Sequence, residues 1–361
     1  MHYFVHMLND FSGSPRIIGT KIECYRSRGA DCKVISSAGP GFIAMDAGPH
    51  HIVSYAKHRS KLVWAMRLLW WHIRTFLYLL VQVRRGDIVH CSTLLTAPHL
   101  LAGRLKRAKT VLHIMETEVN PRLHKAVLLS FARSWAHRVI YLSAYVETSF
   151  KQQFEGKPSR ITYPCIDPAI EADARAATVS VLDPKRFTVG LVCSMIWHKG
   201  YAEFVSLARR CPDIYFLLVL NGQQSAFEAE FPVAVQPANL SVRFNVKRIG
   251  TAIDDMDVLL SLTNRAGWIE TFGLTLIEAM CFGRPVIAPD IGAPKEYIEH
   301  CVSGYLIDES DLDQLAILLE KIRSNPDDYD KMSAAARRVA ERFSYRQFQI
   351  NVGAEKIFAE A

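Results

Sequence analysis

The stretch Glu270–Pro289 reads ETFGLTLIEAMCFGRPVIAP and holds the signals for a turn, a helix and a buried strand. Apolar residues recur at helical spacing between Leu274 and Phe282, which predicts a helix with one apolar side. Gly283 stands where that helix would end, and Pro285 prevents its continuation. Residues 286–288 read Val-Ile-Ala, which predicts a short buried strand.

The first turn of this predicted helix has the properties of an anion-binding site. Gly273 lets the backbone approach a ligand closely. The amides near residues 273–275 lack partners within the helix and carry the positive end of its dipole. We therefore expect a phosphate group to bind at this turn.

Two glutamates bracket the turn. Glu270 precedes it, and Glu278 lies about one turn into the helix, where side chains lean back toward the N-terminus. A carboxylate accepts hydrogen bonds from neighbouring hydroxyls in pairs. The arrangement suits a nucleotide sugar, which has a phosphate centre and polyhydroxyl ends. Taken alone, the same pair is more simply explained as a loop glutamate and a solvated helix glutamate.

With its E-x7-E spacing and its continuation EAMCFGRPVIAPDIGAPKEYI, this stretch resembles the signature of the retaining glycosyltransferases of family 4. The resemblance is specific over residues 187–308 and looser over residues 1–165. It implies the GT-B fold, an α/β architecture in which two Rossmann-like domains with parallel sheets face a central cleft.

The resemblance assigns donor-binding roles in the second domain. Glu278 is expected to hold the ribose hydroxyls, and Glu270 to hold the sugar and diphosphate together with the turn. The donor-binding positions of the turn are Phe272, Gly273, Leu274 and Thr275. Lys199, followed by Gly200, matches a family lysine that contacts the diphosphate, where an ammonium offsets charge on the leaving group. The family usually has an arginine five residues earlier, where this chain has Ser194.

In the first domain, a predicted strand over residues 3–8 precedes a glycine-containing loop and a helix, an order that suggests a doubly wound parallel sheet. The loop offers Gly13, Ser14 and the free amides of a helix start to a ligand. By itself it is also explained as a plain tight turn. The resemblance favours donor contact, because the corresponding family loop touches the donor.

The end of the predicted strand 110–115 carries two more candidates. In family 4, a histidine near this point lies close to the donor sugar. This chain reads METEVNP where relatives read HETxxxP, so Met115 replaces that histidine. His113 and Glu116 are the nearest alternatives, and we count both as catalytic candidates beside Glu270 and Lys199. His113 is equally explained as a hydrogen-bonded core residue.

We expect no metal and no cofactor, because the nucleotide sugar, UDP- or GDP-linked, is itself the substrate. Two D-x-D sequences, at residues 255–257 and 311–313, spell a metal-binding motif of other sugar transferases. We interpret the second as a helix cap and neither as a metal site. The eight cysteines have no CxxC spacing, which favours reduced thiols in a cytosolic protein.

Charge is distributed unevenly along the chain. Residues 1–164 hold 23 Lys and Arg against 9 Asp and Glu, whereas residues 165–361 hold 20 against 27. The first half is therefore expected to face something anionic. No nucleic-acid-binding motif is found, so we expect no nucleic acid and consider an anionic membrane surface.

The stretch 61–85 reads KLVWAMRLLWWHIRTFLYLLVQVRR and is too charged for a membrane span. Its basic residues Arg67, Arg74 and Arg85 fall close to whole helical turns apart, so they predict one stripe. Trp71 and Tyr78 are expected to flank that stripe, a combination that suits an anionic bilayer surface. The alternative is a helix packed on the first sheet with one narrow solvated face.

Residues 161–167 resemble the interdomain linker of the family. We therefore expect an acceptor-binding domain at 1–164, a nucleotide-sugar-binding domain at 165–343, and a terminal helix at 344–361 that returns to the first domain. The expected function is a retaining, metal-independent hexosyl transfer to a saccharide or lipid-linked saccharide in bacterial surface polysaccharide assembly. The expected location is cytoplasmic, peripheral on the inner face of the membrane. Two alternatives are a transferase with a soluble sugar acceptor and a catalytically silent GT-B subunit that binds nucleotide.

Overall fold

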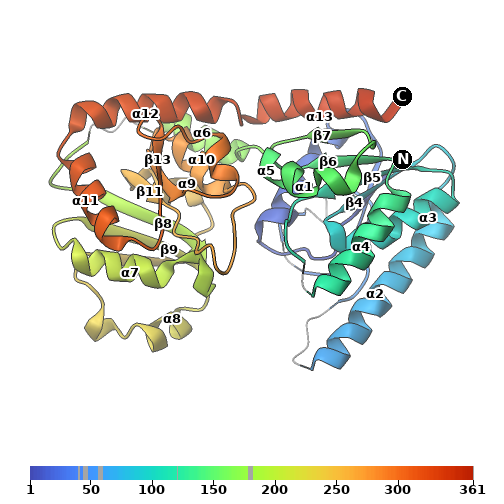
Figure 1. Cartoon of the computed structure of the whole chain (residues 1–361), viewed down its shortest axis with the longest axis horizontal. Coiled ribbons are helices and arrows are strands. Elements are labelled where there is room, and N and C mark those ends of the chain that lie inside the picture. The colour runs from blue at the N-terminus through green and yellow to red at the C-terminus, as the bar shows by residue number, and fades with distance from the viewer. Residues whose placement is uncertain (40, 44–47, 56–59, 120, 178–181, 361) are drawn as a thin grey trace. The chain divides into compact units, whose positions relative to one another are not determined.

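Each half of the chain folds around its own parallel β-sheet (Figure 1). The computed structural model describes residues 1–39, 41–43, 48–55, 60–119, 121–177 and 182–360. Contacts divide the chain into one unit of Met1–Pro164 with Phe348–Ala361 and a second unit of Cys165–Gln347. Ala361, the last residue of the expected terminal helix, lies outside the described residues.

The described residues of the first unit form a seven-stranded sheet in the order β3-β2-β1-β4-β5-β6-β7. Every pair in it is parallel. Its strands are β1 (His2–Val5), β2 (Cys32–Ser36), β3 (His50–Ile52), β4 (Ile88–Ser92), β5 (Lys109–Ile114), β6 (Arg138–Tyr141) and β7 (Ser159–Ile161). Its helices are α1 (Gly13–Arg26), α2 (Lys61–Gln82), η1 (Leu94–His99), α3 (Leu100–Leu105), α4 (Arg122–Trp135), α5 (Ala144–Phe150) and η2 (Lys151–Phe154).

The second unit has a six-stranded parallel sheet within its described residues, in the order β10-β9-β8-β11-β12-β13. Its strands are β8 (Thr188–Ser194), β9 (Tyr215–Asn221), β10 (Leu240–Phe244), β11 (Val258–Leu260), β12 (Val286–Pro289) and β13 (Gly304–Ile307). Its helices are α6 (Pro168–Ala176), η3 (Trp197–Lys199), α7 (Tyr201–Arg210), α8 (Gln224–Glu230), η4 (Val233–Val235), α9 (Ile249–Asp254), α10 (Leu274–Cys281), η5 (Ala293–Glu296), α11 (Leu312–Arg323) and α12 (Pro326–Glu341). The chain ends in α13 (Tyr345–Glu360).

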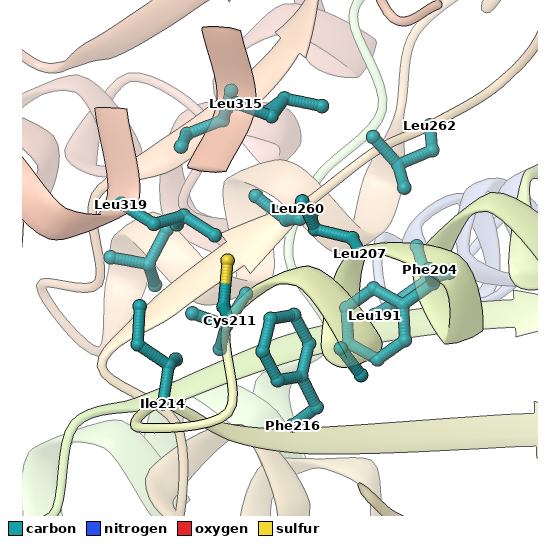
Figure 2. Packing of buried hydrophobic residues seen from close by; sticks show 14 of the residues in the cluster. Leu191, Phe204, Leu207, Cys211, Ile214, Phe216, Leu260, Leu262, Leu315 and Leu319 are labelled. Carbon is teal, nitrogen blue, oxygen red and sulfur yellow. The ribbon is translucent and has the colours of Figure 1, made fainter. Parts of the chain in front are cut away.

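A hydrophobic core of the second unit lies between its sheet and several of its helices, among them α7 and α11. Phe204 from α7 and Leu319 from α11 pack with strand residues such as Leu191, Phe216 and Leu260 (Figure 2). All five side chains are almost completely buried. This apolar layer fixes β8 and β11 as neighbours.

The sequence prediction for residues 274–289 is confirmed. Helix α10 covers Leu274–Cys281, and Gly283 follows it with a φ of 71°, the left-handed conformation that commonly ends a helix. Strand β12 then covers Val286–Pro289, and every residue in it is buried. An α/β architecture with two parallel sheets is confirmed as well.

The predicted basic stripe on α2 is wrong at Arg85. The helix ends at Gln82 because the chain turns through residues 84–87 before β4. Arg67 and Arg74 are both exposed on the helix, but Arg85 lies beyond it. Within the described residues, no helix has both the length and the apolar composition needed to cross a membrane.

The two aromatic residues expected beside that stripe lie on the inner side of α2. Trp71 is completely buried, with its ring edge-on to the His99 ring at 5.2 Å between centroids. Tyr78 stacks on His51 of β3 at 3.6 Å. Neither ring flanks a solvent-facing stripe, because both lie on the side of the helix that packs against the unit.

A buried ion pair fastens α13 to the first unit. Lys21 of α1 lies 2.7 Å from the carboxylate of Glu355, and both side chains are at most 4% exposed. Tyr25 and Thr162 donate hydrogen bonds to the same carboxylate at 3.2 and 2.5 Å. The Glu355 side chain thus attaches the C-terminal part of α13 to the first unit through buried polar contacts.

Replacing Lys21 with methionine should lower the free energy of unfolding by about 3–5 kcal/mol, because it leaves the Glu355 carboxylate buried without its cation. Urea denaturation followed by circular dichroism measures the change. The matched control is Lys331→Met, which breaks an exposed ion pair with Asp328 and should have no measurable effect. Equal effects of the two substitutions would contradict this account of the buried pair.

Candidate active site

The candidate active site of the second unit lies at the carboxyl edge of its sheet, between β8 and β11. From β8 the strand order runs outward to β9 and β10 on one side and to β11, β12 and β13 on the other. Such a reversal of strand order leaves a crevice outside the carboxyl ends of the strands, where open α/β sheets bind ligands. Lys199 follows β8, and Thr263 and Glu270 follow β11.

Lys199 and Glu270 form the centre of this site. The Lys199 ammonium lies 2.5 Å from Oε1 of Glu270, and the Thr263 hydroxyl donates to the same oxygen at 2.8 Å. The two charged side chains are 22% and 18% exposed. Both are thus partly shielded from water, yet a ligand in solution can still reach them.

Close backbone packing explains why the two loops meet. Gly200 has a φ of 78°, and a Cβ placed on it would lie 2.3 Å from the carbonyl oxygen of Leu262. Only glycine allows this approach. The amide of Asn264 also donates to the carbonyl of His198 at 2.8 Å. Residues 198–200 are therefore held against the end of β11.

The turn before α10 has the form that the sequence predicts. Gly273 adopts a φ of 89° directly before Leu274, the first residue of the helix, and residues 273–275 are partly exposed. The Tyr297 hydroxyl donates to the carbonyl of Phe272 at 2.7 Å, which fixes the turn from inside. The first amides of α10 stand at the positive end of the helix dipole, where an anion is stabilised.

Glu278 lies deeper than expected. It is completely buried in α10, whereas the sequence suggested a carboxylate reaching back over the loop. Because no surface of Glu278 is accessible to water, a ribose hydroxyl, which is about as large as a water molecule, cannot contact it in this conformation. Contact with a ligand therefore requires a conformational change around α10.

His113 of β5 has the surroundings of a core residue. It is 2% exposed, with Nδ1 at 3.4 Å from the Lys21 ammonium and Nε2 at 3.1 Å from Nδ1 of His90. Burial, and then the charge of Lys21, holds the pKa of His113 well below its ordinary value. The neutral imidazole is thus engaged on both sides, as the alternative interpretation of His113 describes.

Glu116 follows β5 at the carboxyl edge of the first sheet and is half-buried. Its carboxylate accepts hydrogen bonds from the amides of Leu94 at 2.5 Å and Met115 at 3.2 Å. Burial raises its pKa to about 7, although these hydrogen bonds act in the opposite direction. Glu116 therefore braces the turn after β4 and changes charge near neutral pH.

Gly13 and Ser14 lie in the first turn of α1, after β1. Gly13 is exposed and Ser14 is half-buried. Ser12 precedes them without a side-chain cap on the helix, so the first amides of α1 are not capped by that hydroxyl. The position is compatible with a ligand at the helix start.

Several residues of the second-unit site carried no signal in the sequence. Thr263 is one of them. Arg265 is another; its guanidinium donates from Nη2 to Glu309 at 2.7 Å and from Nε at 2.9 Å. Burial raises the pKa of Glu309, but the hydrogen bonds from Arg265 outweigh burial and lower it. This pair ties the loop after β11 to the loop after β13, across 44 residues of sequence.

Aromatic side chains lie next to Lys199. The ring of His198 is nearly parallel to the Trp268 ring, at 6.2 Å between centroids. Trp197 is 60% exposed and packs edge-on to His198. A wall of this kind beside a phosphate site offers a stacking surface for a base or a sugar ring.

The described residues contain no group of three or more His, Cys, Asp or Glu side chains arranged to hold a metal ion. The two D-x-D sequences have structural roles. Asp257 accepts from the amide of Thr188 at 2.8 Å. Asp311 caps α11 by accepting from Gln314 at 2.9 Å, which confirms its interpretation as a helix cap.

The raised pKa of Glu116 predicts a pH dependence of stability. The carboxyl ionises near its ordinary value of 4.5 in the unfolded chain but near 7 in the folded protein. The folded state binds more protons between these values, so stability falls as pH rises from about 4.5 toward 7. Glu116→Gln should remove this component, which thermal unfolding at about pH 5 and about pH 8 measures. Glu118→Gln, at an exposed position, is the control, and an unchanged pH profile in Glu116→Gln would refute the assignment.

Part of the chain resembles known glycosyltransferases. Residues 176–339 match the family model of glycosyl transferases group 1. Over 84 residues the chain is 45% identical to sucrose synthase from Acidithiobacillus caldus, covering 22% of this chain and 11% of that enzyme. Over 250 residues it is 26% identical to the amylovoran biosynthesis glycosyltransferase AmsK of Erwinia amylovora, covering 65% and 59%. The chain thus matches about a tenth of the length of the first relative and about three fifths of the second.

Solved structures resemble the whole chain. HepE from Anabaena, in complex with UDP, has a TM-score of 0.79 at 17% identity, covering 99% of both chains. Sucrose-phosphate synthase from Thermosynechococcus elongatus has a TM-score of 0.76 at 16% identity, covering 100% of this chain and 99% of that one. At this identity the likeness establishes the fold. The chain has the GT-B fold. Its residues 176–339 are similar to the glycosyl transferases group 1 domain.

Proposed function

We propose that this protein is a retaining glycosyltransferase of family 4 that moves a sugar from a UDP- or GDP-linked donor to a saccharide or lipid-linked saccharide, without a metal ion. The observation that carries this proposal is the contact between Lys199 and Glu270 at 2.5 Å. It places a cation and a carboxylate together at the carboxyl edge of a parallel sheet, in a domain of the glycosyl transferases group 1 family.

The donor binds where these charges and the start of α10 meet. The Lys199 ammonium and the amides of residues 273–275 hold the diphosphate. The ammonium then shares its hydrogen bonds between the diphosphate and Glu270, whose other oxygen accepts from sugar hydroxyls. The turn opens on binding and lets the ribose reach Glu278. A uridine donor is supported by HepE, which was crystallised with UDP-glucose.

The reaction exchanges one bond at the anomeric carbon for another. The bond from that carbon to the diphosphate oxygen breaks, and a bond to the acceptor oxygen forms on the same face of the sugar. The acceptor proton passes to the leaving phosphate oxygen, so no protein base is needed. The sugar passes through an oxocarbenium-like transition state. The protein positions both substrates and stabilises the charge on the leaving diphosphate, a task for which Lys199 is placed.

The acceptor is a saccharide carried on a lipid, and the reaction belongs to surface polysaccharide assembly at the inner face of the membrane. Two observations support this choice. The relative AmsK is named for the biosynthesis of amylovoran. Residues 1–164 carry an excess of 14 positive charges, which favours an anionic acceptor or its anionic surroundings.

A soluble sugar is the second candidate acceptor. The segment that is 45% identical to sucrose synthase and the structural likeness to sucrose-phosphate synthase favour it. Full activity on a soluble sugar that does not change with salt concentration would select this candidate.

Nucleoside diphosphates should stabilise the protein against heat. A ligand at about 100 times its dissociation constant adds roughly 2.7 kcal/mol to the free energy of unfolding. A thermal-shift screen with UDP, GDP and ADP and their sugars should therefore raise the melting temperature for one base and leave the others without effect. Failure of every nucleotide in the screen would count against any nucleotide-dependent function.

Lys199→Ala and Glu270→Gln should each lower kcat/KM by about a hundredfold or more, because each removes a charged group from the reacting centre. A radiolabelled-donor assay measures the rate, and proton NMR of the product should show the anomeric configuration of the donor. Lys331→Ala and Glu320→Gln, both at exposed positions, are matched controls and should keep full activity.

If the protein is instead a catalytically silent GT-B subunit, these substitutions should have no effect on its function. In that case Glu270→Ala and Glu278→Ala retain the biological phenotype, and the wild-type chain shows no turnover with any donor. A product with inverted anomeric configuration would support transferase activity but contradict the proposed retaining reaction.

A further inference from the structure

Helix α2 turns large apolar side chains toward solvent along its whole length. Within the described residues, seven of them are each more than 40% exposed: Leu62, Met66, Leu69, Trp70, Ile73, Leu77 and Val81. Steps of three or four residues separate most of them, which places them on one side of the helix. We call this set the apolar face of α2.

The opposite side of the helix already anchors it to the first unit. Leu68, Trp71, Thr75 and Leu79 are buried there, and the helix packs on η1 and α3. The apolar face is therefore not used in folding. Exposed apolar patches larger than a few hundred Å² are uncommon on monomeric proteins and mark contacts with another protein or with a membrane.

Four cations gather at the C-terminal end of this face. A hollow of about 500 Å³ is lined by Val81 of the apolar face, by Leu105, and by the side chains of Arg84, Arg85, Lys106 and Arg107. Two loops supply these cations, one after α2 and one after α3. A hollow that combines apolar walls with several cations fits a phosphate attached to a hydrocarbon chain.

Most of the charges around the face are positive, although the Asp87 carboxylate accepts a hydrogen bond from the backbone amide of Arg84 at 2.7 Å. In the part of the chain that the structure describes, none of the four cations of the hollow forms an ion pair with a carboxylate. Arg67 and Arg74 are exposed on the helix itself, and residues 61–85 contain no Asp or Glu. The four cations that line the hollow at the end of the apolar face are thus available to an anionic surface.

We propose that the apolar face of α2 lies in the surface of an anionic phospholipid bilayer, with the cations of the hollow on lipid phosphates. The helix lies along the boundary between headgroups and acyl chains, as amphipathic interfacial helices do. This differs from the stripe expected from sequence, because Leu69 and Trp70, rather than Trp71 and Tyr78, enter the lipid. The proposal deepens the membrane location given in the proposed function, but it does not depend on sugar transfer.

Charge selects a bilayer over a second copy of the chain. Two copies joined through this face would bring two sets of cations together, in units that each carry an excess of 14 positive charges over residues 1–164. Like charges facing each other across an interface oppose association. Anionic lipid headgroups instead neutralise the cations while the acyl boundary covers the apolar side chains.

The test is flotation of the full-length protein with vesicles of phosphatidylcholine containing about one third phosphatidylglycerol. The wild-type chain should float with these vesicles, and much less with vesicles of pure phosphatidylcholine or at high salt. Trp70 and Trp64, which are 57% and 37% exposed on α2, should shift the protein's fluorescence to the blue on binding. The double substitution of Trp64 and Trp70 with phenylalanine should remove that change. Fluorescence and flotation do not involve a sugar donor, so a failure here leaves the transferase proposal intact.

Two sets of substitutions probe the two parts of the surface. Serine at Leu69, Ile73 and Leu77 should abolish flotation, whereas serine at the exposed Val233, Val235 and Ile317 of the second unit should not. Glutamine at Arg84, Arg85 and Lys106 should weaken binding about fivefold for each cation removed. Glutamine at the exposed Lys185, Arg186 and Lys247 of the second unit is the matched control. Circular dichroism establishes that each variant is folded.

Two results would overturn the proposal. One is equal flotation of the wild type, the serine variant of α2 and the glutamine variant of the hollow, which would place the lipid contact elsewhere. The other is a lipid-free dimer in analytical ultracentrifugation that the serine substitutions on α2 abolish, which would assign the apolar face to a second copy of the chain.

Discussion

The candidate site depends on one contact, the ion pair between Lys199 and Glu270. Its two partners stand on loops after different strands and are separated by 71 residues of sequence. The pair forms because Gly200 packs against the backbone of Leu262 and because the apolar core keeps β8 beside β11. In the absence of a ligand, the Lys199 ammonium and the Glu270 carboxylate neutralise each other's charge. A diphosphate competes with Glu270 for the ammonium, which couples donor binding to the release of that carboxylate.

Local signals in the sequence were sufficient to predict the helix and the strand that follow this contact in the chain. The stretch from Leu274 to Pro289 folds as predicted, because helical periodicity, a left-handed glycine and a buried strand are all encoded by neighbouring residues. The brace between Arg265 and Glu309 was not predictable, because nothing near either residue indicates its partner. The depth of Glu278 was missed for a similar reason: burial is decided by the helices that pack over α10.

Helix α2 shows why the side that a helix buries is harder to predict than the helix itself. Its sequence has large apolar residues on both sides, so periodicity does not decide between Trp70 and Trp71. The structure buries Trp71 and exposes Trp70, since η1 and α3 cover only one side. His113 gives a second case. It contacts Lys21, which pairs with Glu355 more than 300 residues away in sequence. The sequence near His113 does not indicate this buried network.

A crystal structure of the protein with bound UDP or GDP tests the central claim most directly. The account predicts the diphosphate within hydrogen-bond distance of the Lys199 ammonium and of the amides at residues 273–275, with the ribose turned toward Glu278. A nucleotide bound far from this turn, with Lys199 and Glu270 still paired as they are here, would contradict it.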